Sequence, residues 1–358
     1  MTKKVGILTG GGDCPGLNAV IRGAVFRGLL NYDFEFVGLK YGWKGLLEKD
    51  VFPLGIEDVR DILAEGGTML RTSRTNPRKV EGGLENAYKK YKELKLDGII
   101  VIGGEDTIGA AYDIWKFNNN FKMVGVPKTI DNDLWGTDIT FGFDTAINRA
   151  MESIDNLHTT ARSHNRVMVV ELMGRHAGWI TLEAGLAGNA DIVLLPEEPF
   201  DIEEDLCEPL KKLKESGREY AIVAVSEGAK LKVDEDKDGS LILQEADRDE
   251  FGHVRLGGIG KALSDEIENR VDWESRHVVL GHLQRGGSPS AFDRFLSTRY
   301  GVAAADAIAQ DKSGVMIALK GNEVKPVKMT DDIKKIRKVP EDYIEMTRLF
   351  TANPKSKK

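Results

Sequence analysis

The sequence predicts an α/β protein with two lobes, each built around a mainly parallel sheet. Short runs rich in β-branched residues alternate with longer helical patterns, which is typical of βαβ units with helices on both sheet faces. Most of these runs lack polar alternation, so the strands should be buried on both faces. Nine such runs exceed one comfortable doubly wound sheet, and 358 residues suffice for two separate cores. The predicted strands are Val5–Thr9, Phe34–Leu39, Gly98–Ile102, Met123–Val126, Val167–Leu172, Ile192–Leu195, Ala221–Val225, His277–Leu280 and Val315–Leu319.

Longer amphipathic or apolar stretches between these strands predict the helices. The predicted helices are Asn18–Leu30, Ile108–Phe117, Asp144–Ser163, Ile202–Ser216 and Ala291–Gln310. The polar stretch Lys232–Glu250 is interpreted as an exposed hairpin. It contains the calcium-loop spacing D-x-D-x-D-G-x₅-E at Asp234, Asp236, Asp238, Gly239 and Glu245. An EF-hand also needs a helix on each side, and the flanking residues favour an acidic hairpin tip instead.

The composition narrows the range of partners and compartments. A net charge of −7 argues against nucleic acid or an anionic membrane as the main partner. Cys14 and Cys207 show no CxxC spacing, so neither a disulfide framework nor a zinc site is expected. The first residues contain no signal-peptide apolar region, and no run approaches 18 apolar residues. The expected location is therefore the cytoplasm.

A glycine-rich loop follows the first predicted strand. Residues 10–18 read GGGDCPGLN and lead into a helix. Glycines let backbone N–H groups approach an anion closely, and the helix N-terminus favours negative charge. The loop is neither GxGxxG nor a P-loop. The nearest P-loop candidate elsewhere in the chain, Gly260-Lys261, is rejected because Ala262 follows it and Arg255 stands where the first P-loop glycine belongs. A phosphate-binding loop and a plain tight βα turn both remain open from this segment alone.

Two acidic residues, Glu105 and Asp106, follow a glycine pair at the end of the strand ending at Ile102. Mg²⁺ takes oxygen ligands and keeps substrate phosphates close, so two acids at a strand end suit a metal–phosphate site. The alternative is a helix start at which the acids are favoured by the helix dipole.

The loop after the strand ending at Val126 reads PKTIDND, with Lys128, Thr129, Asp131 and Asp133 close together. Phosphoryl transfer needs a cation on the transferring group, a carboxylate that accepts the proton of the attacking hydroxyl, and a further acid on the metal side. An Asx-turn with solvated charges is the alternative interpretation.

Arginines near the ends of several strands indicate a phosphorylated substrate. Arg166 precedes one predicted strand, and Arg175 and Arg285 follow others. Glu227 comes just past a further strand. Arginine holds phosphate in a bidentate manner, so a group of arginines favours this interpretation, although any one of them alone could form a surface ion pair. The residues together predict a phosphotransferase that acts on a phosphorylated sugar.

Seven segments, in their order along the chain, resemble the phosphofructokinase family. They are TGGGDCPGLNAVIRG, GGTMLRTSR, VIGGEDT, PKTIDND, FGFDTAI, SHNRVMVVELMGR and GHLQRGGSP. The resemblance runs from Val5 to about Leu319. It implies two Rossmann-like, doubly wound lobes with the active site in the cleft between them. Residues 1–142 plus 284–332 would form the phosphoryl-donor lobe, and residues 143–283 plus 333–358 the sugar-phosphate lobe.

The resemblance also implies roles for single residues in a Mg²⁺-dependent reaction of glycolysis and gluconeogenesis. Asp131 would be the base that deprotonates the 1-hydroxyl of fructose 6-phosphate. Thr129 and the backbone of Gly11 and Gly12 would cradle the phosphoryl group. Glu105 stands where ATP-dependent relatives usually carry aspartate, and it is the expected Mg²⁺ group, directly or through water.

The sugar-phosphate side is implied in the same way. The residues expected to hold the 6-phosphate are Arg166, Arg276, His282 and Arg285, and those expected around the rest of the sugar are Ile130, Met173, Gly174, Arg175, Glu227, Leu283 and Gln284. In the family, Arg166 and Arg276 reach across from a neighbouring subunit. The resemblance therefore implies a homodimer or homotetramer with sites shared between subunits.

Two positions argue for pyrophosphate as the phosphoryl donor. ATP-dependent relatives have glycine in place of Asp106, and a carboxylate there fills the space of the nucleotide's α-phosphate and repels that anion. They also have glycine in place of Lys128, where an ammonium group favours the small inorganic donor. Arg74 is expected to bind the donor as well. Pyrophosphate and the sugar bisphosphate product have similar phosphoryl-transfer potential, so the reaction should be reversible.

Four alternatives remain open. Within the family these are an ATP-dependent 6-phosphofructokinase, and a pyrophosphate enzyme that also accepts sedoheptulose 7-phosphate. A non-catalytic sugar-phosphate sensor would be expected to lose its base, but Asp131 and Lys128 are both present. A dinucleotide-dependent oxidoreductase should carry GxGxxG after the first strand and an acid about twenty residues later, and this chain carries neither.

Overall fold

The computed structural model describes residues 2–233, 236–241, 243–248, 254–256 and 258–352. The chain forms two compact units, each assembled from discontinuous segments. Unit 1 contains residues 1–130, 134–145 and 285–335, and unit 2 contains residues 131–133, 146–284 and 336–358. The expected boundaries at 142, 283 and 332 lie close to these crossings, whereas the short passage of residues 131–133 into unit 2 was not expected. The assignment of one unit to the donor and the other to the sugar stays a prediction.

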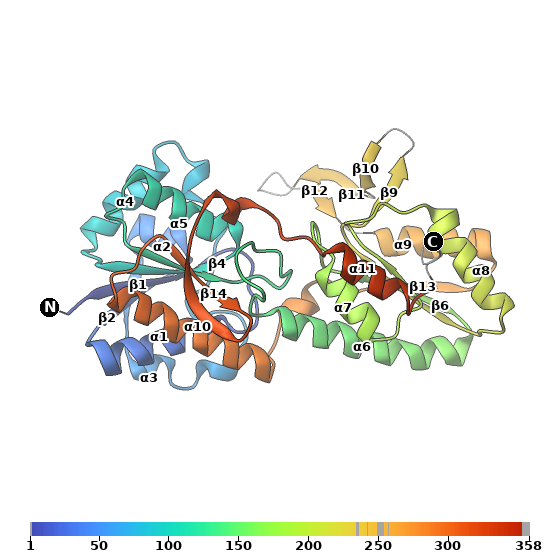
Figure 1. Ribbon diagram of the computed structural model, residues 1–358, viewed down its shortest axis with the longest axis horizontal. Helices are drawn as coiled ribbons and strands as arrows, with labels where there is room; N and C mark the ends of the chain where they lie inside the picture. Colours follow the sequence, from blue (N-terminus) through green and yellow to red (C-terminus); the bar gives the residue numbers. More distant parts are fainter. Residues whose placement is uncertain (1, 234–235, 242, 249–253, 257, 353–358) are drawn as a thin grey trace. The chain divides into compact units, whose positions relative to one another are not determined.

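A seven-stranded sheet in the order β15-β14-β5-β4-β1-β2-β3 forms the centre of unit 1 (Figure 1). The five inner strands are parallel, and each edge strand is antiparallel to its neighbour. The strands are β1 (Lys4–Thr9), β2 (Glu35–Leu39), β3 (Val51–Leu54), β4 (Gly98–Gly103), β5 (Met123–Pro127), β14 (Val315–Lys320) and β15 (Glu323–Lys328). Their side chains are almost all buried, as the unbroken apolar runs predicted.

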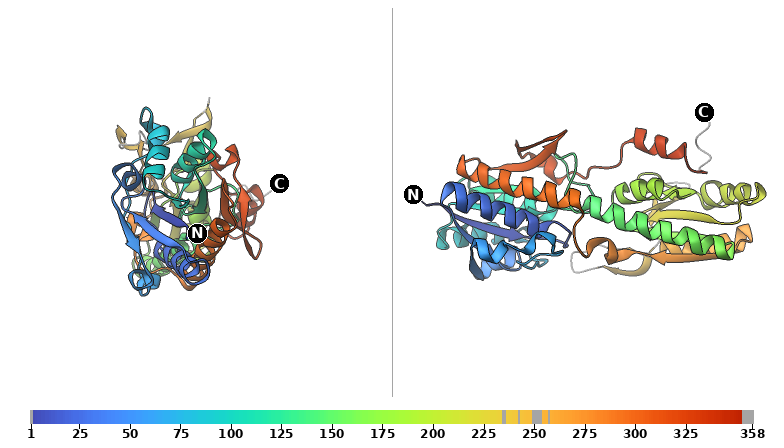
Figure 2. Two further views of the ribbon diagram at one scale, coloured as in Figure 1. Left: turned by 90° about the vertical axis from the view of Figure 1, so that its left-hand side faces the viewer. Right: turned by 90° about the horizontal axis from the view of Figure 1, so that it is seen from below.

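Helices cover both faces of this sheet. One face carries α1 (Leu17–Tyr32) and α10 (Ala291–Ala309), which run side by side (Figure 2, right). They approach closely because glycines face the partner helix: a Cβ at Gly23 would lie 2.7 Å from the Thr298 carbonyl oxygen. The other face carries α4 (Gly83–Glu93) and α5 (Glu105–Phe117). The shorter elements are α2 (Trp43–Glu48), α3 (Ile56–Val59), η1 (Ile62–Ala64), η2 (Pro77–Lys79) and η5 (Asp331–Lys334).

Unit 2 is built around a four-stranded, fully parallel sheet in the order β13-β6-β8-β7. Its strands are β6 (Val167–Leu172), β7 (Ile192–Leu194), β8 (Ala221–Ser226) and β13 (Ser275–Val279). Its remaining elements are α6 (Phe143–His164, of which residues 146–164 belong to unit 2), α7 (Trp179–Ala187), the π-helical turn η3 (Glu203–Cys207), α8 (Glu208–Glu215), α9 (Ile259–Val271), η4 (Gly281–Arg285) and α11 (Glu341–Arg348). Side chains of η3, α8 and α9 pack on one face of the sheet. Helix α7 contacts β7 and β8.

The polar stretch that was interpreted as a hairpin forms strands in unit 2. Strand β9 (Lys230–Val233) pairs with β10 (Asp236–Leu241), and β11 (Leu243–Arg248) pairs with β12 (Val254–Leu256), both antiparallel. Asp234 of the calcium-loop pattern lies outside the described residues. Strands on either side of the pattern replace the helices that an EF-hand requires, so the predicted hairpin is confirmed and the EF-hand is excluded.

All nine predicted strands are present in the two sheets, which confirms the α/β fold with mainly parallel sheets. Two edge strands were missed, because β3 contains Pro53 and β15 contains Pro326. Proline cannot donate to a sheet ladder and is confined to edges, so these runs did not have the pattern of buried strands. The predicted helix Ile202–Ser216 is also interrupted, since η3 precedes α8.

A buried carboxylate fixes the beginning of α6. Asp293 accepts hydrogen bonds from the N–H groups of Gly142 and Thr145 at 2.9 and 2.8 Å, and from the Thr145 hydroxyl at 2.5 Å. Burial raises the pKa of Asp293 to about 6, although these donors act in the opposite direction. The N-terminus of α6 is therefore attached to α10 within unit 1.

Candidate active site

The carboxyl ends of β1, β4 and β5 bring three of the predicted loops together in unit 1. These strands are neighbours, with Thr9 paired to Ile102 and Gly103 paired to Pro127. Ligands of open α/β sheets bind at the carboxyl ends of the strands. The glycine-rich loop, the acids after β4 and the lysine after β5 therefore share one edge of the sheet, in an arrangement suited to phosphate.

Lys128 is a buried cation at this edge, with only 4% of its surface exposed. Its backbone N–H donates to the Gly103 carbonyl at 2.9 Å, which continues the β4–β5 pairing past the strand end. Its ammonium group Nζ donates to the Gly12 carbonyl at 2.5 Å. A buried charge needs partners of this kind, because burial removes its hydration. The side chain therefore spans from β5 to the loop after β1.

Glycines in the loop after β1 leave room for cationic side chains on either side. Gly11 has a φ of 78°, and a Cβ there would lie 3.3 Å from Nζ of Lys128. A Cβ at Gly12 would collide with the guanidinium group of Arg285, which also lies 3.5 Å from the Asp13 carbonyl. Two positive groups thus adjoin an exposed glycine backbone, which is a favourable environment for an anion.

The two acids after β4 lie in the first turn of α5, because the helix begins at Glu105 and not at Ile108 as predicted. Each acid is held by the segment that contains η2. Asn76 donates to Asp106 at 3.2 Å, and Arg78 donates to Glu105 at 3.1 Å. Arg78 also pairs with Asp113, about two helical turns further along α5, at 2.7 Å. The start of α5 is therefore fastened to η2.

Magnesium is the metal that the resemblance implies, and the residues fit it. Among the described residues, no group of three or more His, Cys, Asp or Glu side chains could hold a metal ion. Mg²⁺ does not need such a cage, since it keeps several waters and takes one or two carboxylates together with substrate phosphates. The first turn of α5 offers such a carboxylate in Glu105, the expected Mg²⁺ group.

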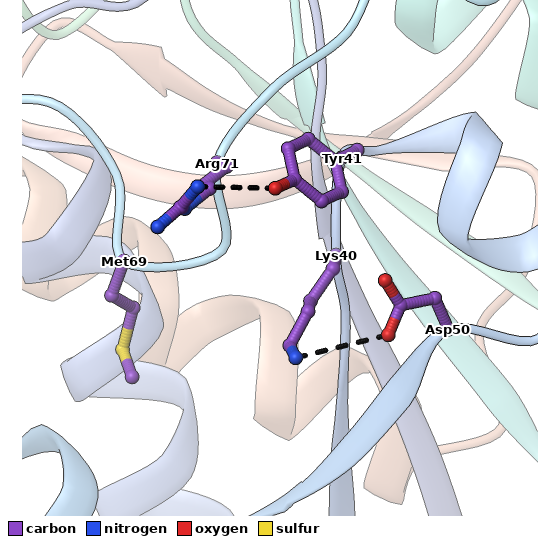
Figure 3. A pocket seen from close by; sticks show the side chains of 5 residues that line it. All are labelled: Lys40, Tyr41, Asp50, Met69 and Arg71. Atoms are coloured by element: carbon purple, nitrogen blue, oxygen red, sulfur yellow. Dashed lines mark hydrogen bonds and ion pairs between the residues drawn. The ribbon is translucent and has the colours of Figure 1, made fainter.

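The segment that carries Arg74 runs from the glycine-rich loop to a pocket of about 340 Å³ (Figure 3). The Thr72 hydroxyl donates to the Gly11 carbonyl at 2.6 Å, and the Ser73 hydroxyl donates to the Tyr41 carbonyl at 2.7 Å. Arg74 itself is exposed. The pocket is lined by Lys40, Tyr41, Asp50, Met69 and Arg71.

Several of the predicted sugar-side residues gather at the carboxyl ends of β6 and β8 in unit 2. Met173, Gly174 and Arg175 follow β6, and Glu227 follows β8, with its N–H donating to the Leu172 carbonyl at 2.8 Å. The Gly174 carbonyl accepts a hydrogen bond from the Ser226 hydroxyl at 2.6 Å, and the backbone N–H of Gly174 donates to the Glu227 carboxyl. Gly174 has a φ of 142°, a conformation that favours glycine.

The carboxyl group of Glu227 is electrostatically coupled to Asp131. Burial is the main cause that raises the pKa of Glu227 to about 7, and the negative charge of Asp131 contributes to the same shift. The Gly174 N–H and the positive charge of Arg175 act in the opposite direction. Two carboxyl groups near one another, one of them titrating near neutral pH, are an arrangement that can hold and move a proton.

The loop that carries Asp131 is held by the chain near its carboxyl end. Asn132 has a φ of 51° and is buried, and its carbonyl accepts from the Arg337 guanidinium at 3.3 Å. The Arg337 N–H donates to the Asp133 carbonyl at 2.7 Å, and its side chain stacks on Trp179. On the unit 1 side of the loop, the Thr129 carbonyl accepts from Thr140 at 2.7 Å, and Ile130 is buried.

Arg166 and Arg276 lie at the opposite end of the unit 2 sheet. Arg166 precedes β6, and Arg276 is the second residue of β13, paired in register with Met168. Both guanidinium groups contact Glu274, at 3.0 and 2.8 Å. Six residues of strand separate Arg166 from Met173, a length of about 20 Å. Within a single chain these two arginines therefore lie away from the loops that follow β6 and β8, and their expected role at the site of a neighbouring subunit stays a prediction.

The remaining predicted residues lie on η4, which follows β13. His282 and Leu283 are exposed, whereas Gln284 is fully buried and donates to the Gly281 carbonyl at 3.2 Å. Arg285, the last residue of η4, belongs to unit 1 and reaches the loop after β1. Asn76, Arg78 and Arg337 were not predicted from the sequence. The N-P dipeptide at residues 76–77 is a general turn signal that could have drawn attention to this segment, but it carries no information on what the turn contacts.

The parallel sheets, the glycine loop between two cations and the acids at the start of α5 define an α/β protein whose strand ends are suited to phosphate groups. A family model described as Phosphofructokinase matches residues 4–308. The chain belongs to the phosphofructokinase family.

Relatives with two different donors in their names are similar to this chain. A pyrophosphate–fructose 6-phosphate 1-phosphotransferase from Amycolatopsis mediterranei is 50% identical over 348 residues, which are 97% of this chain and 99% of the relative. The ATP-dependent 6-phosphofructokinase 3 of Streptomyces coelicolor is 47% identical over 338 residues, which are 94% of this chain and 97% of the relative.

Solved structures share the fold. The Pichia pastoris phosphofructokinase in the T-state matches with a TM-score of 0.78 and 30% identity over 93% of this chain, but this chain spans only 35% of that longer chain. A pyrophosphate-dependent phosphofructokinase from Marinobacter aquaeolei matches with a TM-score of 0.80 and 21% identity, covering 95% of this chain and 86% of that one. The latter likeness concerns the fold alone.

The raised pKa of Glu227 predicts a pH-dependent effect of Glu227→Gln on stability. Between the ordinary glutamate pKa of 4.5 and about 7, the folded protein binds more protons than the unfolded chain. The stabilising contribution is thus full below pH 4.5 and is lost as the pH rises through 7. Glutamine does not titrate, so the variant should gain roughly 1–3 kcal/mol relative to the parent between pH 5 and pH 8. Urea denaturation at both pH values measures this gain, and the change in the difference between pH 5 and pH 8 separates the ionisation from packing, which does not depend on pH. A difference that does not change with pH would contradict the coupling.

Proposed function

We propose that the protein transfers a phosphoryl group from pyrophosphate to the 1-hydroxyl of fructose 6-phosphate, giving fructose 1,6-bisphosphate in a reversible, Mg²⁺-dependent reaction. The observation that carries the proposal is the buried ammonium group of Lys128 on the glycine-rich loop, beside the acidic first turn of α5. Relatives named pyrophosphate–fructose 6-phosphate 1-phosphotransferase, at 48–50% identity over nearly the whole chain, support it.

The choice of pyrophosphate over ATP rests on individual residues, because the overall sequence identity to relatives that use either donor is nearly the same. ATP-dependent relatives are 47–48% identical to this chain, almost as similar as the pyrophosphate-dependent ones. Asp106 places a carboxylate at the start of α5, where it repels the additional phosphate of a nucleotide. Lys128 places a positive charge where the pyrophosphate leaving group develops negative charge. Arg74 and the N–H groups of Gly11 and Gly12 add donors for the phosphate oxygens.

The chemistry follows from the charges of the PKTIDND loop. Asp131 accepts the proton of the 1-hydroxyl as that oxygen attacks the phosphorus, and the charge of Asp131 helps to raise the pKa of Glu227 nearby. Lys128 and Thr129 orient and stabilise the phosphoryl group in flight. Bound Mg²⁺ would neutralise phosphate charge. Glu105 would hold it through water, since one of its carboxylate oxygens is engaged by Arg78.

The acceptor site is proposed to form between subunits of a homodimer or homotetramer. Met173, Gly174, Arg175 and Glu227 would bind the sugar, and His282, Leu283, Gln284 and Arg285 would adjoin its 6-phosphate. Arg166 and Arg276 lie at the far end of the same sheet, so they would serve the site of a neighbouring copy. Sedoheptulose 7-phosphate stays an open second acceptor. The cytoplasmic location stays a prediction; among the described residues, no helix could span a membrane.

The pocket beside Arg71 favours a second candidate function, ATP-dependent phosphoryl transfer. Its volume of about 340 Å³, the Tyr41 ring and the Met69 side chain could receive part of a nucleoside. It connects to the glycine-rich loop through Thr72 and Ser73. Asp106 argues against this candidate, because a nucleotide that reached the pocket would have to bring its phosphates past the carboxylate.

An assay of the purified protein with fructose 6-phosphate and Mg²⁺ separates the two candidates. At equal concentrations of the two donors, turnover should be faster with pyrophosphate than with ATP, because only the smaller donor avoids the charge of Asp106. Formation of fructose 1,6-bisphosphate, the product common to both reactions, measures the two rates. Faster turnover with ATP would overturn the donor assignment.

Sites shared between subunits predict complementation between two inactive variants. Arg276→Ala and Asp131→Ala should each abolish activity, whereas a refolded equimolar mixture should regain about a quarter of the parent activity, since half of the dimers are hybrids with one intact site. Arg218, which lies elsewhere in unit 2 and pairs with Asp191, provides the control. Mixing Arg218→Ala with Asp131→Ala should give no more activity than the Arg218→Ala protein in the mixture has by itself. A mixture that stays inactive would contradict the shared site.

A further inference from the structure

Asn76 links the segment before η2 to the carboxylate of Asp106. The side chain is buried, with 7% of its surface exposed. Its oxygen Oδ1 accepts a hydrogen bond from the Arg78 N–H at 3.0 Å, and its nitrogen Nδ2 donates to Oδ1 of Asp106 at 3.2 Å. A backbone N–H can only donate, and a carboxylate can only accept. The orientation of the Asn76 amide is therefore fixed by its two partners.

The position of Asn76 relative to α5 is fixed as well. Arg78, two residues along, pairs with Glu105 at 3.1 Å and with Asp113 at 2.7 Å, so it is attached to α5 at two places. Its guanidinium group lies against Gly109, where any Cβ would collide with it. Pro77 between them is buried and restricts the backbone. The amide nitrogen is thus presented to Asp106 by a segment that is itself held on the helix.

Asp106 needs such a partner because its side chain is exposed. An exposed aspartate at a helix start can adopt more than one rotamer. A bond to the buried amide favours the rotamer that makes it, and turning away would leave that amide without its acceptor. Asparagine is also neutral, so it holds the carboxylate without cancelling its negative charge. An arginine or lysine in the same place would hold Asp106 and also remove the repulsion.

We propose that Asn76 is a positioning residue for donor specificity: it holds the Asp106 carboxylate, with its charge uncompensated, in the place from which it excludes the nucleotide donor. The inference rests on the proposed function, because it assigns the exclusion to Asp106. Asn76 then discriminates between donors only through Asp106 and contributes nothing to discrimination once that carboxylate is absent.

The test is a double-substitution cycle with Asn76→Ser and Asp106→Gly. Serine can still accept from the Arg78 N–H and cap η2, as asparagine does, but it is too short to reach Asp106. The quantity measured is the inhibition constant of ADP against pyrophosphate. Asn76→Ser alone should strengthen ADP binding about 3- to 10-fold, the factor that corresponds to losing one hydrogen bond. In the Asp106→Gly background, the same substitution should change ADP binding less than about 2-fold.

Two outcomes overturn the inference: no effect of Asn76→Ser on ADP binding, or an equal effect in both backgrounds. Failure of the proposed function looks different, since Asp106→Gly alone would then leave ADP binding unchanged. Asn86→Ser, at an exposed position on α4, is the matched control and should have no effect. Thermal denaturation checks that the variants fold. If Asn76→Ser does not fold, Asn76→Thr keeps the cap, fills more of the space and carries the same expectation.

Discussion

The placement of one buried ammonium group is the constraint on which the donor half of this site depends. Lys128 follows β5 directly, and its side chain crosses to the carbonyl of Gly12 in the loop after β1. Burying this charge is tolerable only while the glycine backbone and nearby anions compensate it. The glycines of that loop leave room for the cationic side chains beside it, since a Cβ at Gly11 would lie 3.3 Å from Nζ of Lys128.

The acidic side chains of the two units have different surroundings. In unit 1, the acids at the start of α5 are held by side chains of the η2 segment, which keeps their charges at fixed places. In unit 2, Glu227 is near Asp131, so one carboxyl group affects the proton affinity of the other. Fixed charge suits discrimination between donors, whereas coupled carboxyl groups suit proton transfer. The charges of unit 1 thus suit its proposed role in donor selection, and those of unit 2 suit its proposed role in proton transfer.

The sequence predicted the buried parallel strands and the loops after them, because an apolar run followed by glycines or charged residues is a local signal. Local signals could not reveal long-range contacts. Nothing in residues 74–79 indicates that Asn76 meets Asp106, and nothing around Arg337 indicates that it holds Asn132 and Asp133. Arg166 and Arg276 were expected to serve a neighbouring subunit, but the sequence did not indicate that both contact Glu274 at the far end of the sheet. The prolines of β3 and β15 are the reason why these two strands were not predicted. Proline is tolerated at sheet edges, so it does not exclude a strand there.

The most direct test of the account is the kinetics of Lys128→Met with pyrophosphate. Methionine keeps most of the buried stem and removes the charge, so the fold should persist. Lys122→Met, at an exposed lysine just before β5, is the control. If the ammonium group stabilises the leaving phosphate in the transition state, kcat should fall about 100-fold while KM for pyrophosphate changes much less. An unchanged kcat, or a loss confined to KM, would contradict the role assigned to Lys128.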